Sequence, residues 1–341
     1  MKKILAYLLF LIFLCLIIPI IFTKENSKTV DVTKKENINK ENKKSEDEKE
    51  SVISDYDYKQ YNKIKLLHVA TNKIEEIALD EYMSGVVASE MPANFELEAL
   101  KAQAVVARTY TIYKIVNNDN KHEGADICDD FKCCQAWISK KEGFEKWKEE
   151  EREVYWSKIV EAVNSTRGKI ITYNGNPINA FFHANSGGTT EQPVNVWGGA
   201  NFPYLQTVTT SGEDSYSQYS SEVNINKKEF EEKIKEYHNN LNIDFNQKDC
   251  IKIEEYTEGN RVKKIKIGNL ELSGVEVRNI IGLKSANFNV EIGDNEIRFK
   301  VIGYGHGVGM SQTGADSLAK QGKKYEEIIK HFYTGVKIEN I

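Results

Sequence analysis

An uncharged run from Ile4 to Phe22 limits what the beginning of this chain can become. An α-helix of that length, rising about 1.5 Å per residue, measures roughly 28 Å and crosses the hydrocarbon core of a bilayer. Lys2 and Lys3 precede the run, so the positive-inside rule predicts that everything after it lies outside the cytoplasm. A cleaved signal peptide is the alternative, although the run is long for one and no small-residue cleavage site follows it. Both interpretations export the rest of the chain, and we expect residues 1–22 to be a single-pass anchor in the cell membrane.

The polar stretch that follows, residues 23–54, consists mostly of Lys, Glu, Asn, Ser and Asp. It holds too few large apolar residues to offset the entropy lost on folding, which predicts a flexible charged linker. Residues 55–341 are long enough for one large domain or two small ones, and we predict one compact exported domain. The formal net charge of −5 at pH 7 and the lack of a basic face argue against nucleic acid as a partner.

Hydrophobic periodicity predicts the elements of this domain. The expected strands are residues 64–69 and 73–79 as a hairpin, 169–173 and 177–183 as a hairpin around Asn174-Gly175, 251–256, 262–267, 289–292 and 296–302. The expected helices are residues 81–90 with Asp80 as their cap, 95–115, 145–165, 226–237, 274–282 and 324–333. Strands and helices mingle without regular βαβ alternation, which predicts an α+β fold of mixed helices and antiparallel strands.

The helix expected over residues 95–115 is Ala-rich and apolar on most of its faces. A helix that is apolar nearly all round is a buried one, so we expect it to be the central packing element. Pro92 precedes it and disfavours helical geometry at Met91, which predicts that the preceding helix ends near Glu90.

Glu90 is a lone acid at that predicted helix end, between apolar elements. The negative end of the helix dipole and desolvation by Met91 and Pro92 both raise the pKa of such a carboxyl. A carboxyl kept protonated near neutrality can act as a general acid. The alternative is an ordinary surface Glu in a last helical turn.

Three cysteines and a histidine cluster at His122, Cys128, Cys133 and Cys134. Adjacent cysteines cannot form a disulfide without strain, whereas one imidazole with three thiolates is a common ligand set for closed tetrahedral zinc. The spacing is not that of a standard zinc finger. Reduced thiols packed as small hydrophobic groups are the alternative.

Two glycine-rich segments each carry a histidine, His183 in residues 183–188 and His306 in residues 305–312. Glycines there allow the backbone to approach a ligand closely. Neither segment has the spacing of a phosphate-binding loop. A structural hydrogen-bonding role is the alternative for either histidine.

Taken together, these segments resemble the stage II sporulation protein D family, peptidoglycan lytic transglycosylases that also include amidase-enhancer proteins. The resemblance rests on residues 88–92, 98–110, 183–188 and 305–312 and extends over essentially the whole domain. It implies that Glu90 is the acid that cleaves between N-acetylmuramic acid and N-acetylglucosamine. It also implies a substrate-binding set of Tyr110, His183, Ser186, Gly187, His306, Ser311 and Gln312.

The resemblance further implies partners, a location and a metal. Members act in forespore engulfment, alongside an amidase that removes stem peptides and a third membrane protein, which implies the mother-cell membrane facing the forespore. The cysteine cluster resembles that of clostridial members, which implies one structural Zn²⁺ on His122, Cys128, Cys133 and Cys134. A His occupies the position of Cys133 in those relatives, so Cys133 departs from their pattern.

Three functions stay open at this point. The first is a lytic transglycosylase acting on denuded glycan strands, for which one acid suffices because the substrate's own C6 hydroxyl attacks and leaves a 1,6-anhydro end. The second is a non-catalytic amidase enhancer that binds wall glycan. The third makes His183 and His306 ligands of a catalytic metal in a zinc amidase, although no HExxH-type pairing supports it.

Overall fold

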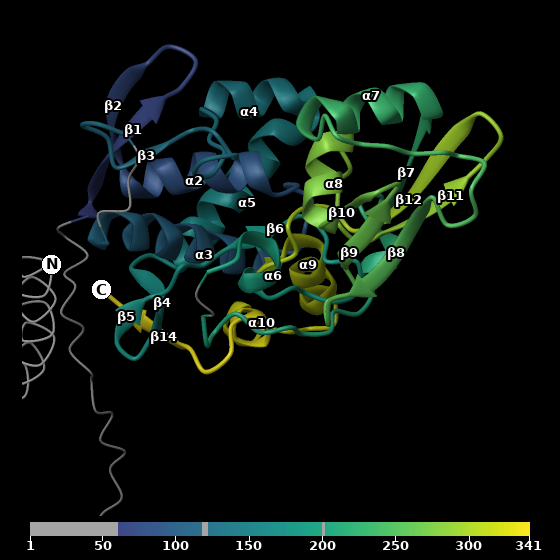
Figure 1. The fold of residues 1–341 in the computed structure, drawn as a ribbon. Helices are drawn as coiled ribbons and strands as arrows, with labels where there is room; N and C mark the ends of the chain where they lie inside the picture. The colour runs from purple at the N-terminus through teal and green to yellow at the C-terminus, as the bar shows by residue number, and fades with distance from the viewer. Residues whose placement is uncertain (1–60, 118–121, 200–201) are drawn as a thin grey trace, which may run out of the picture. The chain divides into compact units, whose positions relative to one another are not determined.

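The computed structural model describes residues 61–117, 122–199 and 202–341 (Figure 1). The predicted anchor, residues 1–22, and linker, residues 23–54, lie outside the described residues. Within those described ranges, no helix is both long enough and apolar enough to cross a membrane.

Helix α3 lies at the centre of the larger hydrophobic core, as its apolar surface predicted. It runs from Leu97 to Val116, and residues 102–112 are all buried. Even Arg108 is fully buried, and its guanidinium donates to three backbone carbonyls at the end of the neighbouring helix and the start of the next strand. These bonds stabilise the buried guanidinium, and they give partners to carbonyls that a helix end leaves unpaired. Around α3 pack α2 (Leu79–Glu90), α5 (Arg152–Ser165), α9 (Gln312–Lys320) and α10 (Tyr325–Phe332).

The predicted first hairpin is confirmed. Strands β1 (Lys63–His68) and β2 (Lys73–Ala78) pair antiparallel, and Asn72 adopts a positive φ of 52° in the turn. A short strand that the sequence pattern did not indicate, β3 (Ile127–Cys128), adds to β1 in parallel. This pairing anchors the cysteine-containing segment to the hairpin.

Helix α2 ends where Pro92 predicted but begins differently. Its last residue is Glu90, and Met91 has extended geometry with φ −125° and ψ 137°. The prediction that Asp80 caps the helix is wrong. The N-cap is Ala78, and Asp80 lies in the first turn, where its carboxylate pairs with Arg167 at 2.9 Å.

The single charged helix expected over residues 145–165 is also wrong. The structure has α4 (Lys140–Lys146), the 3₁₀ turn η2 (Glu149–Glu151) and then α5. A capping box of Ser139 and Glu142 starts α4 upstream of the predicted bound. Trp147 is extended and packs its ring edge-on against Tyr155 of α5, which breaks the helical path.

Strand β4 (Lys169–Tyr173) is the middle of a sheet with order β14-β4-β5. Asn174 and Gly175 take φ of 51° and 77°, the positive values that a tight hairpin turn requires. The predicted second strand, residues 177–183, is not continuous. Its place is taken by β5 (Asn176–Pro177) and β6 (Phe182–His183), and the C-terminal β14 (Lys337–Asn340) pairs with the other edge of β4.

A second hydrophobic core is formed by two three-stranded antiparallel sheets and two helices (Figure 1). Most of these elements match the predicted ranges, whereas β7 and β10 were not predicted. The sheets are β11-β12-β7 and β10-β9-β8. The elements are β7 (Ser220–Asn226), α7 (Lys227–Tyr237), β8 (Ile251–Tyr256), β9 (Val262–Ile267), β10 (Leu270–Leu272), α8 (Gly274–Ile281), β11 (Phe288–Ile292) and β12 (Glu296–Ile302).

The two glycine- and histidine-containing segments meet because β6 pairs in parallel with β13 (Met310–Ser311). The approach is close. A Cβ on Gly309, whose φ is 72°, would lie 2.0 Å from the carbonyl oxygen of Phe181. The remaining short elements are α6 (Pro193–Trp197) and the 3₁₀ turn η3 (Glu213–Ser215). Within the described residues the fold is α+β, as predicted, with antiparallel pairing in the larger sheets and parallel pairing at β1–β3 and β6–β13.

Candidate active site and metal centre

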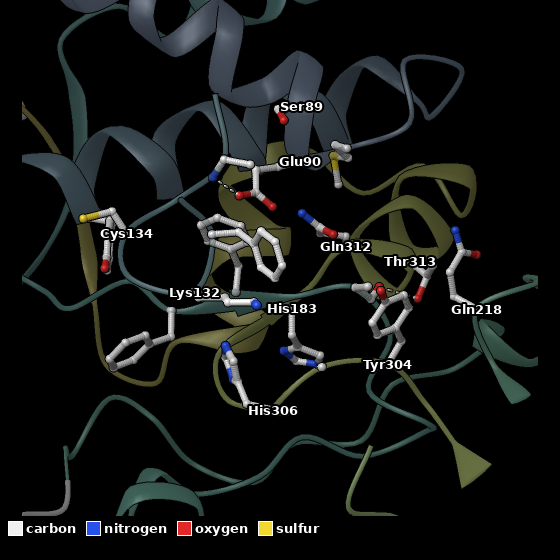
Figure 2. A pocket seen from close by; sticks show the side chains of 18 of the residues that line it. Ser89, Glu90, Lys132, Cys134, His183, Gln218, Tyr304, His306, Gln312 and Thr313 are labelled. Atoms are coloured by element: carbon white, nitrogen blue, oxygen red, sulfur yellow. Dashed lines mark hydrogen bonds between the residues drawn. The ribbon is translucent and has the colours of Figure 1, made fainter. Parts of the chain in front are cut away.

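A pocket of about 1210 Å³ lies where elements of both cores meet (Figure 2). One side is formed by the end of α2 and the segment that follows Cys128, and the other by the β6 segment, α6, α8 and the loop at residues 304–306. Of the residues predicted from the sequence to act on the substrate, those that line this pocket are Glu90, Tyr110, His183, His306 and Gln312.

Glu90 reaches the pocket from the C-terminal end of α2, where the chain turns before Pro92. Its Oε1 accepts a hydrogen bond of 2.5 Å from the backbone N–H of Ala136, the contact drawn in Figure 2. Burial raises the pKa of Glu90 to about 7, against the opposing effects of the Ala136 N–H and of the positive charge of Lys146. Among the described residues that line the pocket, Glu90 is the only acid.

The segment that carries Ala136 is held firmly against α2. The Gln135 side-chain amide donates to the hydroxyls of Tyr82 and Thr111, at 3.0 and 2.9 Å. Trp137 packs over Gly85, where a Cβ would lie 2.2 Å from the indole nitrogen, so no larger residue fits without a shift. These contacts set the position of the N–H that faces Glu90.

The predicted metal ligands come together on the same segment. The four ligand atoms of His122, Cys128, Cys133 and Cys134 all lie within 4.8 Å of one another. His122 Nε2 lies 3.4 Å from Cys133 Sγ and 3.7 Å from Cys134 Sγ, and the two sulfurs are 4.0 Å apart. Tetrahedral zinc with bonds of about 2.3 Å to sulfur and 2.0 Å to nitrogen requires sulfur–nitrogen and sulfur–sulfur separations of roughly 3.6 and 3.8 Å. The geometry and chemistry of this set fit zinc, and Cys133 is part of it.

His183 and His306 face the pocket as neutral imidazoles of opposite tautomer. His183 Nδ1 lies 3.1 Å from the carbonyl oxygen of Val308, an acceptor, so this nitrogen carries the proton. The Val308 N–H donates to His306 Nδ1 at 3.0 Å, which leaves the proton of that ring on Nε2. Burial, followed by the charge of Arg261, lowers the pKa of His183 to about 4, and burial also lowers that of His306. His183 Nε2 is buried without a hydrogen-bond partner among the described residues and offers its lone pair as an acceptor.

An aromatic surface beside these histidines was missed in the sequence. Trp197 is 51% exposed, and its ring lies 4.7 Å from that of Phe181 and 5.0 Å from His306. Phe131, 68% exposed, lines the pocket next to the metal-ligand segment. The available signal for Trp197 was its position directly before Gly198 and Gly199, since glycines of this kind commonly follow the end of a helix.

Ser186 and Ser311 do not line the pocket, although the resemblance implied that both bind substrate. Both hydroxyls donate to the buried carboxylate of Glu213. Gly187 is outside the lining as well. Burial alone would raise the pKa of Glu213, but bonds from Ser186, Ser311, Thr210 and the Gly188 N–H together lower it to about 2. Ser186 and Ser311 therefore join the two histidine segments through Glu213. We leave Ser186, Gly187 and Ser311 out of the proposed binding surface.

Replacing Glu213 tests this joining role. Because the lowered pKa of Glu213 stabilises the fold above the ordinary carboxyl range, and this stability is lost as the pH falls toward 2, Glu213→Gln should be destabilising at pH 7. We expect the free energy of unfolding in urea to fall by about 2–4 kcal/mol. The NH₂ group of the introduced glutamine would face hydroxyl and N–H groups that already donate to this side chain, so some donors would be left without an acceptor. The exposed Glu222→Gln is the control and should change stability little; equal stability of the two variants would contradict the role.

Known proteins are similar to this chain in sequence. A family model described as Stage II sporulation protein matches residues 68–173. Stage II sporulation protein D of Bacillus subtilis is 37% identical over 81% of this chain and 78% of its own length, and that of Bacillus amyloliquefaciens is 35% identical over the same shares. The chain belongs to the stage II sporulation protein D family. It is therefore a sporulation protein by family.

The chain is also similar to a protein with a different name, an amidase enhancer. The amidase enhancer of Bacillus subtilis is 30% identical over 74% of this chain but only 39% of its own length. The segment matched by the family model holds Glu90, Tyr110 and the whole cysteine cluster. In this member of the family, the acid and the metal-ligand set thus lie within one continuous stretch.

Proposed function

We propose that this protein is a peptidoglycan lytic transglycosylase that cleaves between N-acetylmuramic acid and N-acetylglucosamine in glycan strands without stem peptides. The observation that carries the proposal is the lone acid, Glu90, with a pKa raised to about 7, in a pocket large enough for sugar rings. Family membership and the tie to sporulation support it.

A pocket with a single carboxyl suits the lytic transglycosylase reaction better than it suits hydrolysis. Glycosidases place a second carboxylate about 5–9.5 Å from the acid to attack the sugar or activate water. Among the described residues that line the pocket, none other than Glu90 can do so. In the proposed reaction Glu90 gives its proton to the glycosidic oxygen as the bond to C1 breaks. The C6 hydroxyl of the same muramic acid then bonds to C1 and returns its proton to Glu90.

The rest of the pocket suits a sugar ligand. The exposed ring of Trp197 provides an apolar face for a pyranose ring, and His183 Nε2 provides an acceptor for a hydroxyl. Gln312, bonded at 3.4 Å to Gln103, provides an amide for hydroxyl or N-acetyl groups. We propose Tyr110 and His306 as further contacts to the glycan.

Product analysis tests the reaction. The wild-type protein, incubated alone with amidase-treated glycan, should release fragments that end in 1,6-anhydro-muramic acid, which mass spectrometry separates from reducing ends by the loss of one water. Reducing ends would indicate a hydrolase and contradict the proposal. Intact strands would favour the second candidate, a wall-binding amidase enhancer, for which the similarity to a protein of that name is the supporting observation.

The pH dependence of cleavage should follow Glu90. Because the acid must be protonated, kcat/KM should fall about tenfold per pH unit above pH 7. The charge of Lys146 lowers the pKa of Glu90, so Lys146→Met should move this fall to higher pH, whereas Lys146→Arg should leave it in place. A profile that stays level to pH 9 would contradict the role of Glu90.

We also propose that His122, Cys128, Cys133 and Cys134 hold one structural Zn²⁺. The ion would supply a cross-link that fixes the segment from which the Ala136 N–H reaches Glu90. We further propose a single-pass anchor in the mother-cell membrane facing the forespore, and an engulfment complex with a sporulation amidase and a third membrane protein.

A further inference from the structure

The pocket carries a strong excess of positive charge. Lys114, Lys132, Lys146 and Arg278 line it, and among the described lining residues the only acid is Glu90, whose pKa is raised to about 7. A neutral sugar polymer has no need of such a surface. The charges therefore point to an anionic group on the ligand.

Arg278 differs from the other cations in its surroundings. It projects from α8, on the wall contributed by the second core, and is half-buried. Its Nε donates to the carbonyl oxygen of Leu283 at 3.4 Å, and no carboxylate in the described ranges forms an ion pair with its guanidinium. Arg298, on a sheet of the same core, pairs instead with three glutamates. A half-buried guanidinium without an acid is costly unless a ligand completes it.

The position of Arg278 connects it to the glycan-binding part of the pocket. It lines the same pocket as His183 and His306, and its positive charge contributes to the lowered pKa values of both imidazoles. Tyr304, which also lines the pocket, is the titratable neighbour that acts on Arg278. Arg278 and the two histidines thus belong to the lining of one pocket.

We propose that Arg278 binds the free lactyl carboxylate of a muramic acid in the strand and so selects strands without stem peptides. This inference rests on the proposed function. In a peptide-bearing strand the lactyl carbonyl is an amide and neutral, whereas removal of the peptide leaves a carboxylate on each muramic acid. A planar guanidinium matches a carboxylate with two parallel hydrogen bonds, which an amide cannot accept in the same way.

Two of the other three cations in the lining, Lys132 and Lys146, suit this task less well. Lys132 is exposed and is among the labelled lining side chains in Figure 2. An exposed ammonium gains little from a single anion in salt solution. Lys146 is exposed as well, and its charge acts on Glu90.

The test uses two forms of one substrate, peptide-free glycan oligomers with free lactyl carboxylates and the same oligomers converted to methylamides. Wild-type protein should cleave the carboxylate form roughly 10- to 100-fold faster in kcat/KM, the range expected for a hydrogen-bonded charge pair. Arg278→Gln should bring this ratio close to one, because it slows cleavage of the carboxylate form. Arg278→Lys should keep part of the preference. Lys252→Gln, which removes an exposed charge on β8 outside the pocket, should leave the ratio unchanged.

A binding measurement separates this inference from the proposed reaction. Glu90→Gln protein, titrated calorimetrically with both oligomers, should bind the carboxylate form more tightly, and the double variant with Arg278→Gln should bind both forms alike. A preference in binding without any cleavage by wild-type protein would overturn the reaction but keep the carboxylate site. Equal rates on both oligomers, or a preference that survives in Arg278→Gln, would overturn the carboxylate site alone.

Discussion

Glu90→Gln should lower the release of 1,6-anhydro fragments from peptide-free glycan by about 10²- to 10⁴-fold, the range of general acid–base catalysis. The amide keeps the size of the side chain and an oxygen that accepts from the Ala136 N–H, but it has no proton to give to the glycosidic oxygen. The measurement is the initial rate of anhydro-end formation by quantitative mass spectrometry. Glu81→Gln is the matched control, because Glu81 is an exposed acid on the same helix, α2, and should keep the full rate.

Glu90→Gln should be more stable than the wild type at alkaline pH, where the wild type loses stability. The pKa of Glu90 in the folded chain, about 7, lies above its ordinary value, so its favourable contribution is complete below the ordinary value and disappears as the pH rises through 7. At pH 8.5 the folded wild type holds a buried carboxylate that the amide avoids. We expect Glu90→Gln to be up to about 3 kcal/mol more stable in urea unfolding at pH 8.5 and equal to the wild type near pH 4. A variant that is inactive and less stable at both pH values would mean that Glu90 holds the fold together.

Loss of the proposed zinc should have the second large effect. Cys128→Ser with Cys134→Ser removes two of four ligands, one of them fully buried, so zinc measured by mass spectrometry of the metal should fall from about one equivalent to none. The melting temperature should drop by about 10 °C or more, because structural zinc contributes several kcal/mol to a fold. Cys250→Ser is the matched control, since Cys250 is a buried free thiol in the second core, and it should keep its zinc.

The zinc variant should also lose activity, for a reason visible in the structure. Cys134 is followed within two residues by Ala136, whose N–H faces Glu90. Freeing the segment at Cys134 removes a constraint on that N–H, although the contacts of Gln135 and Trp137 with α2 persist. We therefore expect a partial loss of rate. Unchanged zinc content in the double variant would contradict the assigned ligands, and full activity without zinc would contradict the link to Glu90.

Much of the fold could be predicted because its signals are local. The hairpin turn at Asn174-Gly175, the buried helix α3 and the end of α2 each follow from a few neighbouring residues. The errors arose where a distant contact decided the outcome. Trp147 breaks the expected long helix because its ring packs on Tyr155, and β3 forms because β1 accepts it in parallel.

The functional site, too, could be predicted where its signals are local and not where contacts between elements decide the outcome. Four candidate zinc ligands within a short segment and an acid before a proline are patterns of residue type and spacing, and the structure brings each set to one place. Ser186 and Ser311 carried the same kind of pattern, yet their hydroxyls point to Glu213, a residue that no local signal connected with either.

The uncharged run at the beginning of the chain, with the polar linker after it, supports an exported and anchored protein from the sequence alone, because membrane crossing depends on local hydrophobicity. The sequence likewise indicated Glu90 as the acid that we propose to be catalytic. Only the tertiary structure decided which groups share a pocket with that acid. They are the Ala136 N–H, the imidazoles of His183 and His306 and the guanidinium of Arg278. These groups come from segments up to about two hundred residues apart, and their proximity depends on how the two cores pack, which no periodicity or spacing within a segment encodes.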